Sequence, residues 1–137
     1  MRELYKMLNF KELGDDRGNL VVIEGNQDIP FEIKRIFYIF GSDSTVVRGK
    51  HANKKSEFVL VNVAGSSKVM ITDGDKKEII VLDKPMEAVY LPKMIWKEMY
   101  DFSNDSILLV IASTHYDGKE YIRDYKEYLK IMENYDG

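Results

Sequence analysis

The stretch RGKHANKKSE, residues 48–57, decides the fold, and it contains His51, Asn53 and Glu57. Successive side chains of a β-strand point to opposite sides, so residues two positions apart share a side. His51 and Asn53 have this spacing, and both would point to the same side of such a strand. The stretch therefore predicts a strand that carries polar side chains into the interior of a β-barrel.

Short runs rich in β-branched and aromatic residues surround this stretch on both sides. They are residues 20–23, 33–40, 58–61, 69–71, 79–82, 88–91 and 107–112. Turn-forming residues separate the runs, and the pair Asp73-Gly74 between two of them predicts a β-hairpin. From Asp117 on, apolar residues recur every three or four positions, and Asp117 with Glu120 resembles a capping box. We predict an all-β sandwich or barrel followed by one C-terminal α-helix.

The composition limits the class of protein. A chain of 137 residues has the length of one domain, and we expect residues 1–137 to form it. The absence of cysteine excludes disulfides and thiolate zinc sites. No apolar run approaches the roughly 20 residues that span a bilayer, and no signal peptide is visible, so we expect a cytoplasmic protein without a membrane partner. A formal net charge of -3 argues against a general nucleic-acid binder.

The spacing of this stretch is similar to the first motif of metal-binding cupins, which reads G, HxH, a glutamate and a later glycine. His51 and Glu57 fill two ligand positions, but Asn53 stands where the second histidine is expected. The second motif, PxGxxH, corresponds to PKMIWK at residues 92–97, so Lys97 replaces its histidine. A protonated lysine repels a cation, and transition metals favour imidazole and carboxylate ligands. The resemblance implies a cupin-type jelly-roll barrel, and the replacements predict no functional metal and no cofactor.

Residues 48–55, RGKHANKK, resemble the R-G-x-H-A-H-K-K segment of the sugar-nucleotide 3,4-ketoisomerases, which act on dTDP-4-keto-6-deoxyglucose. Other similar segments extend the resemblance over nearly the whole chain: residues 16–20, 29–38, 96–102 and 121–125. The resemblance implies a metal-independent enzyme that moves a keto group from C4 to C3. Its product would enter the synthesis of deoxyamino sugars for lipopolysaccharide or S-layer glycans. It also implies a homodimer with exchanged N-terminal strands, and we expect Leu4 to Phe10 to cross to the partner.

The resemblance implies two histidines as the acid–base pair, and this chain keeps only His51. Histidine takes and returns protons near neutrality, so we expect His51 to remove the C3 proton and leave an enediolate. Asn53 cannot accept a proton, but its amide can donate a hydrogen bond to the enediolate. Lys97 can stabilise that anion or supply a proton at C4, which water could also supply. We predict an active isomerase with His51, Asn53 and Lys97 at its catalytic centre.

Anion binding is expected from a basic cluster in an acidic protein. Arg48, Lys50, Lys54 and Lys55 supply positive charge of the kind that a nucleotide diphosphate needs. The alternative, for Lys50 and Lys55 in particular, is a solvated charged turn.

Arg35 and Tyr38 match family positions near the nucleotide, but a separation of three residues does not share a face on a regular strand. We therefore expect one of them to face elsewhere. Glu57 either points into the barrel or pairs with Lys54 or Lys55. The predicted substrate-binding residues are Arg17, Arg35, Tyr38, Arg48, Lys54, Glu57 and Glu98.

Two other functions remain open at this point. One is a sugar-nucleotide-binding protein without catalysis, in which Asn53 marks an inactive site. The other is a related epimerase that uses the same enediolate chemistry at another carbon. An engineered change at residue 53 is a further alternative, but the departure at Lys97 favours natural divergence.

Overall fold

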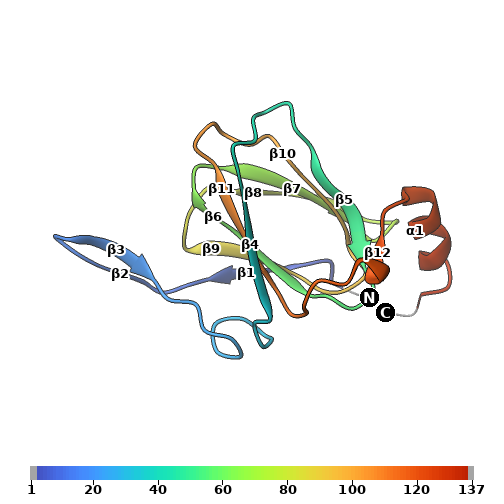
Figure 1. Cartoon of the computed structure of the whole chain (residues 1–137), viewed down its shortest axis with the longest axis horizontal. Coiled ribbons are helices and arrows are strands. Elements are labelled where there is room, and N and C mark those ends of the chain that lie inside the picture. Colours follow the sequence, from blue (N-terminus) through green and yellow to red (C-terminus); the bar gives the residue numbers. More distant parts are fainter. Residues whose placement is uncertain (1–2, 136–137) are drawn as a thin grey trace.

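Two five-stranded antiparallel sheets form the body of the protein, and the computed structural model describes residues 3–135 (Figure 1). The first sheet has the order β1 (Lys6–Asn9), β9 (Glu87–Leu91), β6 (Phe58–Ala64), β11 (Ile107–Ala112) and β4 (Arg35–Phe40). The second has the order β12 (Tyr121–Ile122), β5 (Arg48–Asn53), β10 (Trp96–Tyr100), β7 (Ser67–Thr72) and β8 (Lys77–Leu82). Within residues 3–135, no hydrogen-bonded pair of strands joins the two sheets into a closed barrel. The predicted all-β cupin-type class with a C-terminal helix is confirmed.

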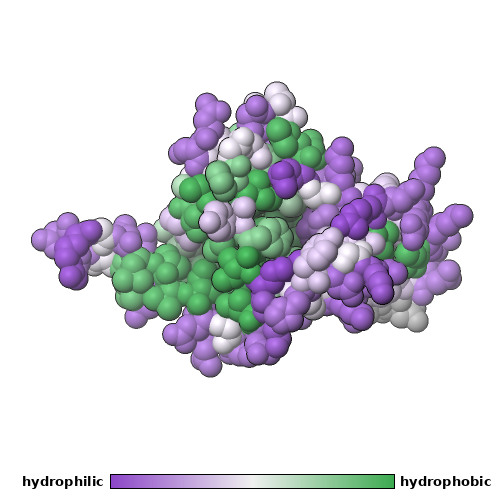
Figure 2. Space-filling model, in the orientation of Figure 1, coloured by the Kyte–Doolittle hydropathy of each residue, from purple (hydrophilic) through white to green (hydrophobic). Residues whose placement is uncertain are grey.

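The N-terminal part contains a strand and a projecting hairpin. β1 pairs with β9 of its own chain, and Leu4 and Phe10 are buried on either side of it. This pairing is the one that a single chain makes, so the exchange of Leu4 to Phe10 between two chains stays a prediction. The segment that leaves the body is the hairpin of β2 (Glu12–Asp15) and β3 (Gly18–Val21), as Figure 1 shows. In Figure 2 hydrophobic atoms gather over β4 and toward the base of this hairpin.

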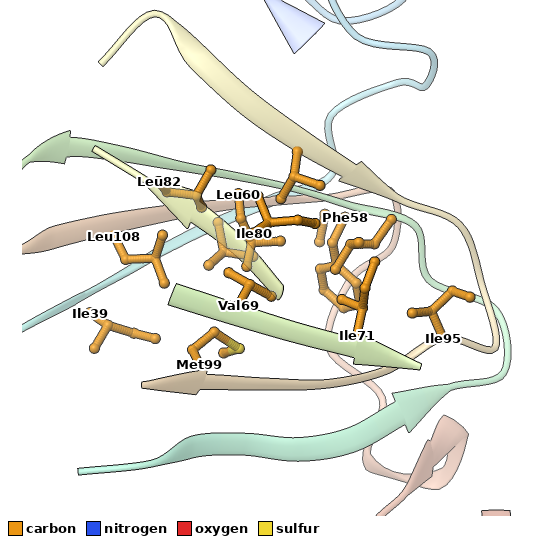
Figure 3. Packing of buried hydrophobic residues seen from close by; sticks show 14 of the residues in the cluster. Ile39, Phe58, Leu60, Val69, Ile71, Ile80, Leu82, Ile95, Met99 and Leu108 are labelled. Carbon is orange, nitrogen blue, oxygen red and sulfur yellow. The ribbon is translucent and has the colours of Figure 1, made fainter. Parts of the chain in front are cut away.

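The main core lies between the two sheets (Figure 3). Alternation explains it: Phe58 and Leu60 of β6 point to the second sheet, while Val59 and Val61 pack into a separate cluster on the outer face. In Figure 3, Val69 and Ile71 of β7 meet the side chains of β6 from the opposite sheet. β6 is thus buried on both faces over most of its length.

The C-terminal segment differs from the prediction. Asp117 begins only the 3₁₀ turn η1 (Gly118–Glu120), which leads into β12 beside β5. Glu120 turns inward instead of back toward Asp117, so the predicted capping box and helix start are wrong. The helix α1 (Tyr125–Met132) begins at Asp124, whose side chain accepts hydrogen bonds from the first-turn backbone. No helix among residues 3–135 has the length and apolar character needed to cross a membrane.

Candidate active site

A cavity of about 170 Å³ lies between the two sheets and is bordered by β4, β5 and β10. Its lining includes Arg48, His51 and Lys97 together with the apolar rings of Phe37 and Phe58. A larger hollow of about 550 Å³ lies on the β2–β3 hairpin, but it is shallow and exposed. We place the site in the smaller cavity, because titratable groups and apolar walls meet there.

The pairing of β5 with β10 sets the two central residues against each other. Lys97 lies directly opposite His51 in this ladder, and the register shifts between Lys97 and Glu98. Gly49 makes the close approach possible: a Cβ at this position would lie 3.0 Å from the Met99 sulfur and 3.1 Å from the Lys97 carbonyl oxygen. Its φ of +85° also favours glycine. The glycine of the RGKH sequence therefore helps to hold Lys97 opposite His51.

His51 offers a free ring nitrogen to the site. Its Nδ1 is buried and has no hydrogen-bond partner among the described residues. The Tyr121 ring contacts the imidazole edge to face, with 4.9 Å between ring centroids. Burial, and after it the charge of Lys97, lowers the pKa of His51 to about 3. The imidazole is therefore neutral at physiological pH, as a proton acceptor has to be.

Lys97 is an ammonium group held in an apolar environment. Its side chain is 3% exposed, and its Nζ lies 4.8 Å from the centre of the Phe58 ring. The nearest polar contact is the Oδ1 of Asn53, at 3.5 Å. Burial lowers the pKa of Lys97 to about 7, although the negative charge of Glu120 opposes the shift. Lys97 can thus donate or accept a proton near neutrality.

Asn53 does not reach the cavity as a free hydrogen-bond donor. It is buried, and its Nδ2 donates to Oε2 of Glu120 over 2.9 Å. The amide oxygen faces Lys97 instead. The sequence interpretation, in which the amide donates to the enediolate, is therefore not supported by this orientation.

Arg35 and Tyr38 of β4 face different sides, as the sequence predicted. The Arg35 guanidinium lies inside, where its Nη1 is 3.5 Å from the Tyr121 hydroxyl and its carbon 5.4 Å from the Phe37 ring centre. Its Nε and Nη2 are buried without a hydrogen-bond partner among the described residues. Tyr38 borders the cavity, but it is 60% exposed on the outer face.

Two other predicted binding residues lie away from the cavity of their own chain. Arg17 is at the hairpin tip, where it pairs with Asp15 at 2.5 Å. Glu57 accepts a hydrogen bond of 2.5 Å from the Tyr90 hydroxyl on the outer side of the first sheet. Its side chain points neither into the barrel nor to the neighbouring lysines.

The last two predicted residues are also separate from the cavity. Glu98 accepts a hydrogen bond of 2.9 Å from the Trp96 indole, which lies near α1. Lys54 follows β5 and is exposed. Of the residues predicted from the sequence, the structure brings together His51, Lys97, Arg48 and Asn53. Arg35 is connected to them through Tyr121, which contacts His51.

The donor set does not fit a transition metal. Among residues 3–135 no group of three or more His, Cys, Asp or Glu side chains gathers. The position opposite His51 holds Lys97, whose protonated form repels a cation. We therefore assign no step of the chemistry to a metal.

Three residues beside the site were not predicted from the sequence: Glu120, Tyr121 and Arg123. Glu120 was interpreted only as a helix cap, whereas its carboxylate lies against Asn53. Tyr121 contacts His51, and the Arg123 guanidinium lies 4.5 Å from the Tyr121 ring centre. The resemblance at residues 121–125 was the available signal, but it did not say where these side chains point.

The sequence matches known proteins over nearly its whole length. The family described as "FdtA: WxcM-like, C-terminal" matches residues 3–133. A TDP-4-oxo-6-deoxy-alpha-D-glucose-3,4-oxoisomerase from Aneurinibacillus thermoaerophilus is 46% identical over 127 residues, which cover 93% of this chain and 91% of the relative.

Solved structures agree with this match. A 3,4-ketoisomerase from Helicobacter canadensis is 42% identical with a TM-score of 0.93, over 95% of this chain and 98% of the other. A mutant of the 3,4-ketoisomerase QdtA from Thermoanaerobacterium thermosaccharolyticum, in complex with TDP-4-keto-6-deoxyglucose, is 37% identical with a TM-score of 0.94 over 100% of both chains. The chain therefore belongs to the WxcM-like family.

Proposed function

We propose that this chain isomerises a nucleotide-linked 4-keto-6-deoxyglucose to the 3-keto sugar, with His51 as the base. The chain is an enzyme of the 3,4-ketoisomerase type, like its relatives at 37–46% identity. The observation that carries the residue assignment is the pairing of His51 with Lys97 across β5 and β10 in one cavity. One group is neutral with a free nitrogen, and the other has a pKa near neutrality.

The reaction needs one proton acceptor and one group that stabilises the negative charge developing on the sugar. His51 takes the proton from C3, and the electrons of the C3–H bond form a double bond to C4. The C4 oxygen becomes negative, and the Lys97 ammonium stabilises this charge in an apolar cavity. The proton of the C3 hydroxyl moves to the C4 oxygen, directly or through water. A proton delivered to C4 from Lys97 or water completes the 3-ketone, and the proton held by His51 returns to Lys97 or to solvent, so the sugar gains and loses no atom and the enzyme is restored.

Arginine side chains around the cavity supply the expected anion contacts. Arg48 lines the cavity, and Arg35 carries two buried donors without partners among the described residues. Buried donors of this kind are rare, because leaving them unsatisfied is costly. A diphosphate oxygen near Arg35 would satisfy them. We assign Arg35 and Arg48 to the nucleotide diphosphate on this basis.

The product fits a place in deoxyamino-sugar synthesis, since a ketone at C3 is the group that an aminotransferase would replace with an amine. We propose that the product supplies such a step for bacterial glycans. We also propose a cytoplasmic location, because a chain without cysteine has no disulfide to form in an oxidising compartment. The alternatives left open by the sequence, a binding protein and an epimerase, are less consistent with the relatives.

Incubation with dTDP-4-keto-6-deoxyglucose in D2O tests the reaction itself. We expect formation of the 3-keto sugar, with loss of the C3 proton and deuterium at C4 in the NMR spectrum. Chelator should not change the rate, because the chemistry above uses no metal. A protein that binds the nucleotide sugar but shows neither turnover nor exchange at C3 would be a binding protein instead.

We further propose that the active protein is a homodimer in which the β2–β3 hairpin of each chain lies on its partner. Leu13 and Leu20 of the hairpin are 42% and 55% exposed in the single chain. β4 is an edge strand, and its outer face exposes Ile36, Tyr38 and Phe40. An edge strand with an exposed apolar face favours association with another chain. A twofold dimer would bury the hairpin and the outer face of β4 together. Arg17 at the hairpin tip would then lie at the partner's site.

The dimer is expected to depend on the outer face of β4. Phe40→Glu places a charge on a side chain that is 69% exposed in the single chain, and should shift the mass in solution from dimer to monomer. Ile79→Glu, on the edge strand β8 with 56% exposure, is the matched control and should remain dimeric. Sedimentation at micromolar concentration measures both. A monomeric parent protein would contradict the proposal.

A further inference from the structure

A buried carboxylate, that of Glu120, lies beside the site without lining the cavity. Glu120 is 4% exposed and ends the turn η1, directly before β12 pairs with β5. Its Oε1 accepts hydrogen bonds of 2.9 Å from the backbone N–H groups of Lys55 and Ser56. Its Oε2 accepts from the Ser56 hydroxyl and from Nδ2 of Asn53.

These contacts fix which way the Asn53 side chain points. An ionised carboxylate can only accept hydrogen bonds, so Asn53 must turn its amide nitrogen toward Glu120. The amide oxygen then faces Lys97, with 3.5 Å between Oδ1 and Nζ. The opposite orientation would place an oxygen against the carboxylate and an NH2 group against the ammonium. The chain of contacts therefore runs from Glu120 through Asn53 to Lys97.

We propose that Glu120 is a positioning residue of the ketoisomerase, which acts through Asn53 to hold a protonated Lys97 opposite His51. The proposal rests on the role of Lys97 given above. Glu120 itself touches neither the cavity nor the reacting atoms. Asn53 is, in this arrangement, the link that transmits the orientation rather than a donor to the substrate.

The charges around Lys97 agree with this role. From β5, the neutral His51 and the cationic Arg48 face the same cavity, and Arg123 lies near His51. Phe58 of β6 supplies only a ring face. Glu120 is the anion whose charge raises the pKa of Lys97 against the effect of burial. Burial alone would raise the pKa of Glu120, but hydrogen bonds from Ser56, Lys55 and Asn53 hold it below its ordinary value, so the carboxylate stays charged.

A merely structural role is the competing explanation, because Glu120 also ties η1 to the segment between β5 and β6 through Lys55 and Ser56. Two variants separate the roles. Glu120→Gln removes the negative charge. It also places an NH2 group, which cannot accept a hydrogen bond, among groups that donate to the carboxylate. Ser56→Ala removes one donor to the same carboxylate but leaves the contact between Glu120 and Asn53 in place, so it is the matched control for a local disturbance.

The titration of Lys97, followed by NMR of labelled lysine and assigned with Lys97→Arg, is the direct readout. In Glu120→Gln we expect its midpoint to fall, because the negative charge of Glu120, which raises the pKa of Lys97, is lost. We expect kcat near neutral pH to fall by up to about 100-fold through misplacement of the acid, with KM within about threefold. Ser56→Ala should keep the parent midpoint. If Glu120→Gln does not fold, Asn53→Ala breaks the link alone and should lower the midpoint too.

The results distinguish this inference from the proposed chemistry. A loss of kcat in Glu120→Gln with an unchanged Lys97 midpoint would overturn the positioning role and leave a structural one. A shifted midpoint of the Lys97 titration with an unchanged pH profile of kcat would support the link between Glu120 and Lys97. The same result would overturn the catalytic role of Lys97.

Discussion

Replacing His51 with asparagine is expected to lower kcat by about 10²- to 10⁴-fold, the usual contribution of a general base. The free Nδ1 of a neutral imidazole is the proton acceptor that the cavity offers, and asparagine cannot accept a proton. Asparagine fills a similar space and adds no charge, so the fold and TDP binding should remain. Turnover and C3 exchange in D2O, with calorimetry of TDP binding, measure the effect.

The chain offers a matched control, since His115 is its other histidine and is exposed. His115→Asn should retain the parent rate. Full exchange at C3 in His51→Asn would place the base elsewhere. Lys97 would then be the first candidate, because Glu57 lies on the outer side of the first sheet.

The structure also changes the expected pH profile. The sequence alone suggests a rate that rises through the ordinary pKa of histidine, about 6.5. Burial and Lys97 lower the pKa of His51 to about 3 in the free protein, so the base is already neutral well below that range. A bound diphosphate would raise this pKa by its negative charge. The change of rate near neutral pH is instead expected from Lys97. The rate should fall as the pH rises through about 7, because Lys97 loses its proton there.

The strands of the core were predictable because they carry continuous or alternating apolar residues. The predicted runs correspond to β4, β6, β7, β8, β9 and β11 of the two main sheets and to β3 of the projecting hairpin, and the hairpin at Asp73-Gly74 joins β7 to β8. β5 has the sequence RGKHAN, in which Ala52 is the apolar residue, and in WKEMY of β10 the charged pair Lys97-Glu98 interrupts the apolar residues. The spacing of the two cupin-like motifs, rather than hydrophobicity, predicted these two strands. The two strands that carry His51 and Lys97 were thus harder to predict from hydrophobicity than β4 and β6, which also line the cavity.

The errors at single residues have physical causes of their own. Glu57 follows a break between β5 and β6, so alternation counted from His51 does not reach it. Its side chain shares the side of Val59, on the outer face. Glu120 finds its partners 64 to 67 residues earlier in the chain, and no local pattern contains that information. The pairing of β1 with β9 is likewise a long-range contact that no local pattern contains.

Replacing Lys97 with methionine is expected to lower activity and raise stability together. Without the ammonium the enediolate loses its cation, and kcat should fall by roughly 10²-fold or more. The fall in rate near pH 7 should disappear from the pH dependence of turnover. Turnover in D2O across pH 5–9 measures both effects. Lys77→Met, at an exposed lysine of β8, is the control and should behave like the parent.

The gain in stability follows from the lowered pKa of Lys97, which falls from 10.5 to about 7 on folding. Between these two values the unfolded chain binds more protons than the folded one, so the free energy of unfolding rises with pH across this window. Below about pH 7 the buried ammonium costs the folded state about 3–5 kcal/mol. Methionine fills the same volume without a charge and removes this cost. Urea unfolding at pH 6 and pH 9 should therefore show a stability gain for Lys97→Met that is large at pH 6 and smaller at pH 9. Equal stability of both proteins at pH 6 would mean that Lys97 is not held as a buried cation.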